Sequence, residues 1–365
     1  MLQHRPAINR LAPSIHGGID YEELKRLGIL PEVVLDFSVS INPFGPPPGI
    51  KEVLVNASVE HYPDSEASEL RQALAEKLNI SPGKLIVGNG STELIRLTAA
   101  AYLEPNDLVI IPQPTYSEYQ TACQLADAKI MKQPVLKEPD FHLDVCEITK
   151  LLRKHKPKAV FLCNPNNPTG QYMSRGEVAQ IMSSAPESLI VLDEAYIAFT
   201  ENAWASVDLI DHGNLVILRS MTKDYALAGL RLGYAIAEES IISQLRRVRP
   251  PWNVNSVAQK AGIVALNADS YLKGCYNKIR KAKNFLIKEL ECLGLSPLPS
   301  QTNFFLVRVG NAATFRQALL KKGLLVRDCT SFGLPEYIRL APRSLSECQK
   351  LIEAIKDMGA LNHAS

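Results

Sequence analysis

A chain of 365 residues is long enough for one large and one smaller domain, each with a buried core. An apolar fraction of 46% and a charged fraction of 21% are ordinary for a globular protein. The formal net charge of +2 gives no case for a nucleic acid or a membrane surface, so we expect a small-molecule partner.

The cysteines and the N-terminus indicate the compartment. The seven cysteines are scattered, form no C-x-x-C motif and have no histidine nearby at metal-ligand spacing. This pattern predicts no metal site. It is more typical of a protein in a reducing compartment than of a disulfide-bonded protein. Residues 1–10 lack the apolar core of a signal peptide, and no apolar run is long enough to span a membrane. We therefore expect a cytoplasmic protein.

The first part of the chain contains two polar motifs and a break. Residues 16–18 read HGG, and residues 33–43 read VVLDFSVSINP. Residues 46–49, PPPG, stop regular structure. We therefore predict a large domain over residues 48–260, with residues 1–47 and 261–365 forming an N-terminal segment and a small C-terminal domain.

Strands and helices then alternate. Helices are predicted over residues 50–57 and 68–78, on either side of HYPD at 61–64. A strand at 85–87 leads into GNGST at 88–92 and a helix at 93–103, with Ser91 as its N-cap. Glycine and hydroxyl residues at a helix start expose N–H groups to an anion, which the helix dipole also attracts.

Five more apolar runs predict strands of a largely parallel sheet that is covered by helices on both faces, at residues 108–111, 159–163, 189–192, 215–218 and 232–237. Residues 256–293 are expected to be helical. Beyond them we predict a small α/β layer in which strands and helices alternate. Its elements are expected at residues 304–309, 312–322, 324–327, 338–341 and 344–358.

Polar motifs follow three of these strands. NPNNPTG occupies residues 164–170, DEAY occupies 193–196, and SMTK occupies 220–223, with Arg231 eight residues after Lys223. Ligands of open α/β sheets bind at the carboxyl ends of the strands. A lysine that leaves a buried strand among hydroxyl groups is therefore placed for chemistry.

Together these motifs resemble the pyridoxal-phosphate (PLP) dependent aminotransferases of fold type I, over essentially the full chain. The resemblance implies an α/β fold with a mostly parallel sheet between helices in a large domain, plus a smaller α/β domain. It also implies the cofactor pyridoxal 5'-phosphate. Lys223 would bond covalently to the cofactor's aldehyde and then act as a base. Asp193 would keep the ring nitrogen protonated.

The resemblance assigns further cofactor contacts. Tyr196 and Asn167 would bind the ring hydroxyl, and Tyr116 would stack on the ring. Tyr62 would reach the phosphate of a neighbouring subunit, which implies a homodimer with shared active sites. The phosphate would otherwise be held by residues with N–H, hydroxyl or guanidinium groups: Gly90, Ser91, Thr92, Ser220, Thr222 and Arg231.

For several of these residues an ordinary structural role is the alternative. Lys223 could be a surface lysine, Asp193 a helix cap, and Asn167 a turn residue. Tyr116 could simply pack in the core, and Tyr62 could be an ordinary half-buried tyrosine.

The substrate side rests on two arginines in apolar strands. By resemblance Arg339 would bind a carboxylate, and Arg327 suggests a second anion, a phosphate. His16-Gly17-Gly18, residues 36–45 and residues 251–255 resemble the threonine-phosphate decarboxylases of cobalamin biosynthesis. His16, Gly17, Ser38 and Asn167 would then join the substrate site.

The expected reaction is therefore decarboxylation of threonine phosphate to aminopropanol phosphate. A histidinol-phosphate aminotransferase or a related amino-acid aminotransferase is the alternative, because both groups share the cofactor residues. A binding protein that has lost catalysis is disfavoured, because Lys223, Asp193 and Arg231 are all present.

Overall fold

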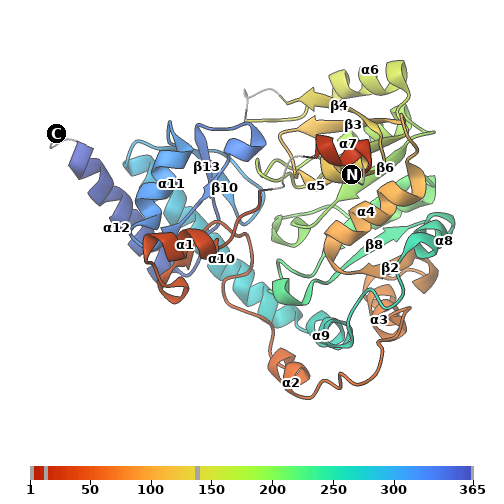
Figure 1. The fold of residues 1–365 in the computed structure, drawn as a ribbon, viewed down its shortest axis with the longest axis horizontal. Helices are drawn as coiled ribbons and strands as arrows, with labels where there is room; N and C mark the ends of the chain where they lie inside the picture. The colour runs from red at the N-terminus through yellow and green to blue at the C-terminus, as the bar shows by residue number, and fades with distance from the viewer. Residues whose placement is uncertain (1–3, 12–14, 136–139, 363–365) are drawn as a thin grey trace.

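The computed structural model describes residues 4–11, 15–135 and 140–362. A seven-stranded sheet between helices stands beside a smaller α/β part built on a four-stranded sheet (Figure 1). Helix α10 (Asp269–Cys292) joins the two, because Leu272 near its start packs in the core of the large sheet and Leu286 near its end packs in the core of the small one. The predicted fold class is confirmed, whereas the domain boundaries near residues 48 and 260 stay a prediction.

The large sheet has the strand order β2-β8-β7-β6-β5-β3-β4, and its strands other than the edge strand β4 contain buried apolar runs. β5, β6 and β8 are buried at every position, as expected for strands covered on both faces. β8 runs antiparallel to both of its neighbours, and the β7–β6–β5–β3–β4 pairs are parallel. The strands are β2 (Leu85–Gly88), β3 (Leu108–Gln113), β4 (Lys129–Pro134), β5 (Ala159–Cys163), β6 (Leu189–Asp193), β7 (Leu215–Ser220) and β8 (Gly233–Ala237).

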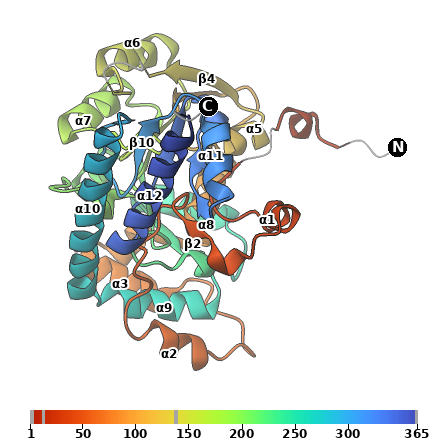
Figure 2. The same cartoon turned by 90° about the vertical axis from the view of Figure 1, so that its left-hand side faces the viewer.

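Alternate side chains of these strands enter two cores, one on each face. Leu192 of β6 packs in the core that includes residues of α3, α6, α7 and α9, whereas Val191 packs in the core that includes residues of α4, α5 and α8. The helices of this part are α2 (Ile50–Val55), α3 (Ser68–Leu78), α4 (Gly90–Tyr102), α5 (Glu118–Leu125), α6 (Val145–His155), α7 (Arg175–Ser184), α8 (Glu239–Val248) and α9 (Ser256–Leu266). α2 lies at the margin of the molecule in both views (Figures 1 and 2).

The smaller part is an antiparallel sheet in the order β12-β13-β10-β9, with α11 and α12 packed beside α10 (Figure 2). Its N-terminal neighbour β1 pairs in parallel with β11 in a separate two-stranded sheet. The elements are α1 (Tyr21–Leu27), β1 (Leu35–Asp36), β9 (Ser296–Pro297), β10 (Phe305–Arg308), α11 (Ala312–Leu320), β11 (Leu324–Leu325), β12 (Arg327–Asp328), β13 (Tyr337–Leu340) and α12 (Leu345–Asn362).

Three local predictions need correction. The strand expected at 324–327 is split between two sheets, because β11 pairs with β1 and β12 pairs with β13. The helix expected at 256–293 is broken between Leu266 and Asp269. Ser91 is not an N-cap, because α4 already begins at Gly90 and its N-cap is Asn89. No helix in the described ranges is both long enough and apolar enough to cross a membrane.

Candidate active site

A cavity of about 450 Å³ opens where β5, β6 and β7 end. Cys163, Asp193 and Ser220, the last residues of these strands, all line it. Most of the residues that the sequence predicts for the site also line it: His16, Gly17, Ser38, Ser91, Thr92, Tyr116, Asn167, Asp193, Tyr196, Ser220, Thr222, Lys223, Arg231, Arg327 and Arg339. Side chains from both parts of the molecule thus meet in one cavity.

Lys223 is anchored through its backbone, and its side-chain amine lies near the Tyr196 ring. Its carbonyl accepts a hydrogen bond from the Asn42 N–H at 2.8 Å, and its Nζ lies 5.7 Å from the centroid of the Tyr196 ring. Burial, with the positive charges of Arg339 and Arg231, lowers the pKa of Lys223 to about 8. A surface lysine would not be perturbed in this way, and a lysine with a pKa near 8 has a sizeable neutral, nucleophilic fraction near neutral pH.

Asp193 is a buried carboxylate at the end of β6, with 3% of its surface exposed. One of its oxygens accepts a hydrogen bond from the Tyr119 hydroxyl at 2.7 Å, and the other accepts one from the Ala195 N–H at 2.9 Å. Burial raises the pKa of Asp193, against the hydrogen bonds and the charge of Lys223. A cationic ring nitrogen at this carboxylate would relieve the cost of burying it.

Hydroxyl groups and one guanidinium gather near the start of α4. Ser220 and Thr222 share a hydrogen bond between their hydroxyl oxygens at 2.7 Å, and the Thr92 hydroxyl lies 3.3 Å from that of Tyr116. Gly90 has a φ of +77°, which L side chains rarely adopt, and a Cβ there would stand 2.8 Å from the Arg231 Nη2 and displace the guanidinium. Gly90 itself does not line the cavity, and it acts by letting the guanidinium approach. The set suits an anion at the N-terminus of a helix.

Tyr116 and Asn167 lie at the same cavity in distinct environments. The Tyr116 ring meets Tyr119 edge-on with centroids 5.6 Å apart and lies 5.8 Å from the ring of His16. Burial raises the pKa of Tyr116 to about 12. The Asn167 side-chain oxygen accepts a hydrogen bond from Arg339, so this residue joins the predicted cofactor side to the predicted substrate side.

Arg327 and Arg339 are directly opposed across the β12–β13 pair. Both are buried, with 7% and 5% of their surfaces exposed. Arg327 donates to the carbonyls of Ile15 and His16 and to the Ser331 hydroxyl, and Arg339 donates to Asn167 and to the Ser38 carbonyl. Among the described residues no carboxylate forms an ion pair with either of them, and the buried Arg339 Nε has no hydrogen-bond partner. Two like charges at opposed positions repel each other, so this pair favours a bound anion.

The N-terminal segment closes one side of the cavity. The Gly18 N–H donates to the Ser38 hydroxyl at 2.8 Å, and this hydroxyl donates to Asp36 at 2.6 Å. The polar atoms of the Ser38 side chain are therefore engaged within the protein. A Cβ at Gly17 would stand 2.6 Å from the Ser38 carbonyl oxygen, so glycine is required for this packing.

Several residues that line the cavity were not predicted from the sequence, and Tyr119, Glu118 and Arg96 are the ones with polar contacts to predicted residues or to one another. Tyr119 supports Asp193, and Glu118 lies between Arg96 at 3.1 Å and His16 at 3.5 Å. No motif marked them, because each acts through a residue at least 22 positions away. Conversely, Tyr62 does not line the cavity of its own chain, and 79% of its surface is exposed.

Comparison with known proteins gives consistent likenesses. A family model described as aminotransferase class I and II matches residues 32–355. The histidinol-phosphate aminotransferase of Thermoanaerobacter pseudethanolicus is 38% identical over 85% of this chain and 87% of its own. The crystal structure of histidinol-phosphate aminotransferase from Sinorhizobium meliloti in complex with pyridoxal-5'-phosphate is 25% identical, covers 98% of this chain and 99% of its own, and has a TM-score of 0.88.

These likenesses correct the predicted reaction. The threonine-phosphate decarboxylase prediction is wrong, because a relative at 38% identity is a histidinol-phosphate aminotransferase. The L-threonine-O-3-phosphate decarboxylase structure from Porphyromonas gingivalis is 27% identical, covers 88% of this chain and 98% of its own, and has a TM-score of 0.78. Two of the segments that favoured this reading also have a structural role, although His16, Gly17 and Ser38 line the cavity. Gly17 packs against the Ser38 carbonyl, and the Asn42 amide donates to the Asp224 carbonyl at 3.0 Å.

The cavity also fits the predicted cofactor. A buried lysine with a lowered pKa, a buried carboxylate and an anion cradle at a helix start are the three groups that PLP needs. The cofactor prediction is confirmed, because PLP is the cofactor of the family and is bound in the Sinorhizobium meliloti relative. The extent of the family match and the identity to full-length relatives show that the chain belongs to the class I and II aminotransferases.

Proposed function

We propose that the protein is a PLP-dependent aminotransferase whose amino donor is a phosphorylated amine, with histidinol phosphate as the first candidate. The observation that carries the proposal is the opposed pair Arg327 and Arg339. Because cross-strand partners place their side chains on the same face, one phosphate dianion can accept hydrogen bonds from both guanidiniums. The names of two relatives, at 38% and 34% identity, support the same substrate.

We propose the following roles around the cofactor, which supplies an aldehyde for the amino group and a ring that accepts electrons from the substrate Cα. The Lys223 Nζ holds the cofactor and then takes and returns the Cα proton, for which a pKa near 8 is suitable. Asp193, oriented by Tyr119, holds the proton on the ring nitrogen. The groups around Arg231 and the start of α4 hold the cofactor phosphate. Asn167 and Tyr196 bind the ring hydroxyl, and Tyr116 covers the ring.

A homodimer is part of the proposal. Tyr62 is exposed and absent from the cavity of its own chain, so its predicted phosphate contact requires a second copy. In such a dimer each cavity would be completed by the other chain's tyrosine.

Steady-state assays with paired substrates test the substrate class. We expect transamination of histidinol phosphate with 2-oxoglutarate to exceed that of unphosphorylated histidinol by on the order of 100-fold in kcat/KM. That factor corresponds to about 2.7 kcal/mol, the range of one or two charge-assisted hydrogen bonds. In Arg327→Gln this ratio should shrink by at least about tenfold. Equal turnover of the two substrates by the unaltered protein would contradict the proposal.

The lowered pKa of Lys223 predicts the pH dependence of cofactor uptake. Only the neutral amine attacks an aldehyde, and the Lys223 pKa is lowered to about 8 from the ordinary value near 10.5. The rate of covalent uptake by the cofactor-free protein should therefore rise with pH up to about 8 and then level off. Stopped-flow absorbance measures this rate. A rate that keeps rising to about pH 10 would indicate an unperturbed lysine.

A further inference from the structure

Two exposed aromatic rings stand together at the margin of the large sheet. Tyr62, in the connection between α2 and α3, stacks on Trp252 with centroids 4.3 Å apart and an interplanar angle of 20°. Their exposed fractions are 79% and 47%. Trp252 has a φ of 53°, in the left-handed region that a bulky residue rarely adopts. Such a conformation persists only where the surroundings hold it in place.

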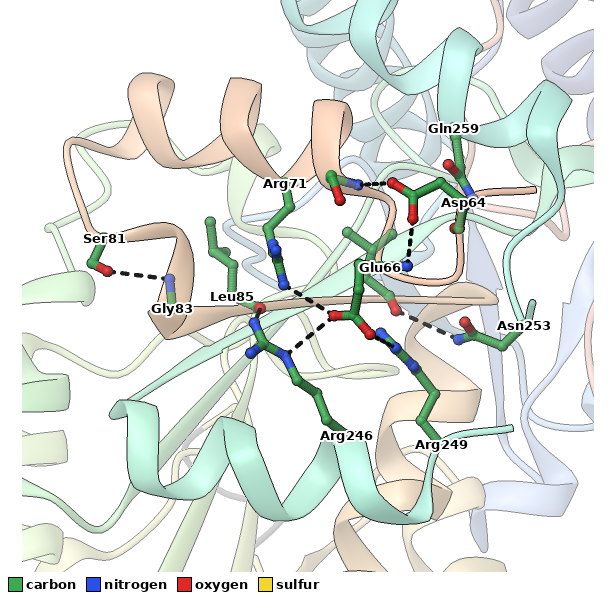
Figure 3. Close-up of polar contacts among 12 residues, drawn as sticks. Asp64, Glu66, Arg71, Ser81, Gly83, Leu85, Arg246, Arg249, Asn253 and Gln259 are labelled. Atoms are coloured by element: carbon green, nitrogen blue, oxygen red, sulfur yellow. Dashed lines mark hydrogen bonds and ion pairs between the residues drawn. The ribbon is translucent and has the colours of Figure 1, made fainter. Parts of the chain in front are cut away.

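A partly buried charge cluster lies four residues after Tyr62 and just before Trp252 in the chain, around Glu66 (Figure 3). The Glu66 carboxylate accepts hydrogen bonds from Arg71 of α3 at 3.1 Å and from Arg249, and it lies 3.7 Å from the Arg246 Nε. We call Glu66 and these three arginines the Glu66 cluster. Figure 3 shows the carboxylate between Arg71 on one side and the two arginines of the α8 end on the other. Glu66 thus ties the Tyr62 segment to both helices.

Neighbouring bonds fix the same two segments. The Asp64 carboxylate accepts from the N–H groups of Glu66 at 2.9 Å and Ser68 at 2.7 Å, and the Gln259 amide donates to the Asp64 carbonyl (Figure 3). The Asn253 amide, next to Trp252, donates to Glu93 at 2.6 Å. Residues close in sequence to both Tyr62 and Trp252 are therefore fixed by hydrogen bonds.

The charge balance singles out Glu66. The Arg249 and Arg71 side chains are 7% and 18% exposed, whereas those of Arg246 and Glu66 are 30% and 42% exposed, so water screens the repulsion among the arginines only in part. In the described part of the chain, Glu66 is the only carboxylate with ion pairs to these three arginines. Asp64 and Glu239 act on Arg71 and Arg246 only at longer range. Removing the Glu66 charge would leave three guanidiniums facing one another.

We infer that Glu66 is a positioning residue: its charge fixes residues 56–67 so that Tyr62, backed by Trp252, is presented to the cofactor phosphate in a second copy of the chain. The inference rests on the role proposed for Tyr62. Glu66 itself touches neither substrate nor cofactor, and it acts through the placement of the tyrosine.

Two readouts test the inference on the holoenzyme. The first is the rate of cofactor loss on dilution, followed by absorbance. The second is acrylamide quenching of Trp252 fluorescence in a Trp204→Phe background, because the chain has two tryptophans. We expect Glu66→Gln to speed cofactor loss about tenfold, the effect of about one charge-assisted hydrogen bond at the phosphate, and to increase quenching. Glu69→Gln, an exposed glutamate on α3, is the matched control and should change neither readout.

A double-mutant cycle with Tyr62→Phe separates positioning from general stability. If Glu66 acts through Tyr62, then Glu66→Gln should add less than about twofold to the cofactor loss of Tyr62→Phe. Full additivity would overturn the inference, because Glu66 would then stabilise the fold only. Unchanged cofactor loss in Tyr62→Phe itself would instead remove the role proposed for Tyr62. Should Glu66→Gln not fold, Glu66→Asp, which keeps the charge but shortens the side chain, carries the same cycle with an intermediate effect.

Discussion

Replacing Lys223 by alanine is expected to lower kcat by about 10³-fold or more, because the proton carrier at the substrate Cα and the anchor of the cofactor are lost together. The loss should appear in kcat rather than in folding. Lys223 lies in the cavity three residues after β7 ends, and no hydrogen bond of its Nζ to a described residue is broken by the change. Transamination kinetics and a thermal melt of the same preparation check the two statements.

Lys283→Met is the matched control. Burial lowers the pKa of Lys283 to about 8 as well, but its Nζ donates to the carbonyls of Ser300 and Thr302, and it does not line the active-site cavity. This variant should be less stable yet keep kcat within about tenfold. If Lys223→Ala retained more than about a tenth of the turnover, the assignment of the reactive amine would be wrong.

Replacing Asp193 by asparagine is the second change with a large expected effect. The amide has nearly the same shape but no charge, so the ring nitrogen loses the group that keeps it protonated. We expect kcat to fall by about 10²-fold or more, the scale of losing one preorganised electrostatic partner. The absorbance of the bound cofactor should change too, because its ring is then neutral. Both quantities are measured on the loaded protein.

The Tyr119→Phe variant serves as a comparison for the loss of kcat in Asp193→Asn. It removes one hydrogen bond of 2.7 Å to Asp193 and leaves the carboxylate charge in place, which corresponds to about 1–2 kcal/mol or roughly tenfold. An Asp193→Asn variant no slower than Tyr119→Phe would show that the charge is dispensable.

Much of the fold can be predicted from the sequence, because buried strands consist of continuous apolar runs. Apolar runs predict six of the seven strands of the large sheet within a residue or two. The edge strand β4 was missed, because Lys129–Pro134 contains an apolar run of only two residues, Ile130 and Met131, and none of its residues is buried. The reversal of β8 was also missed, since an apolar run carries no direction.

The site residues that lie in sequence motifs could be predicted. Those that reach the site only through tertiary packing could not. Lys223, Asp193 and Arg231 lie in recognisable motifs, whereas Tyr119 reaches Asp193 across 74 residues of sequence. The opposed register of Arg327 and Arg339 likewise depends on how two strands pair. The predicted substrate is wrong because the resemblance of His16-Gly17-Gly18 to a decarboxylase motif does not determine the reaction. Gly17 and Gly18 instead pack the N-terminal segment against Ser38.

We propose that the Lys223 amine carries the cofactor in a cavity completed by Asp193. Borohydride reduction of the loaded protein, followed by digestion and mass spectrometry, locates the modified residue directly. We predict a single cofactor adduct on the peptide that contains Lys223. An adduct on another lysine, such as Lys283, or reduced protein with no adduct at all, would contradict the claim.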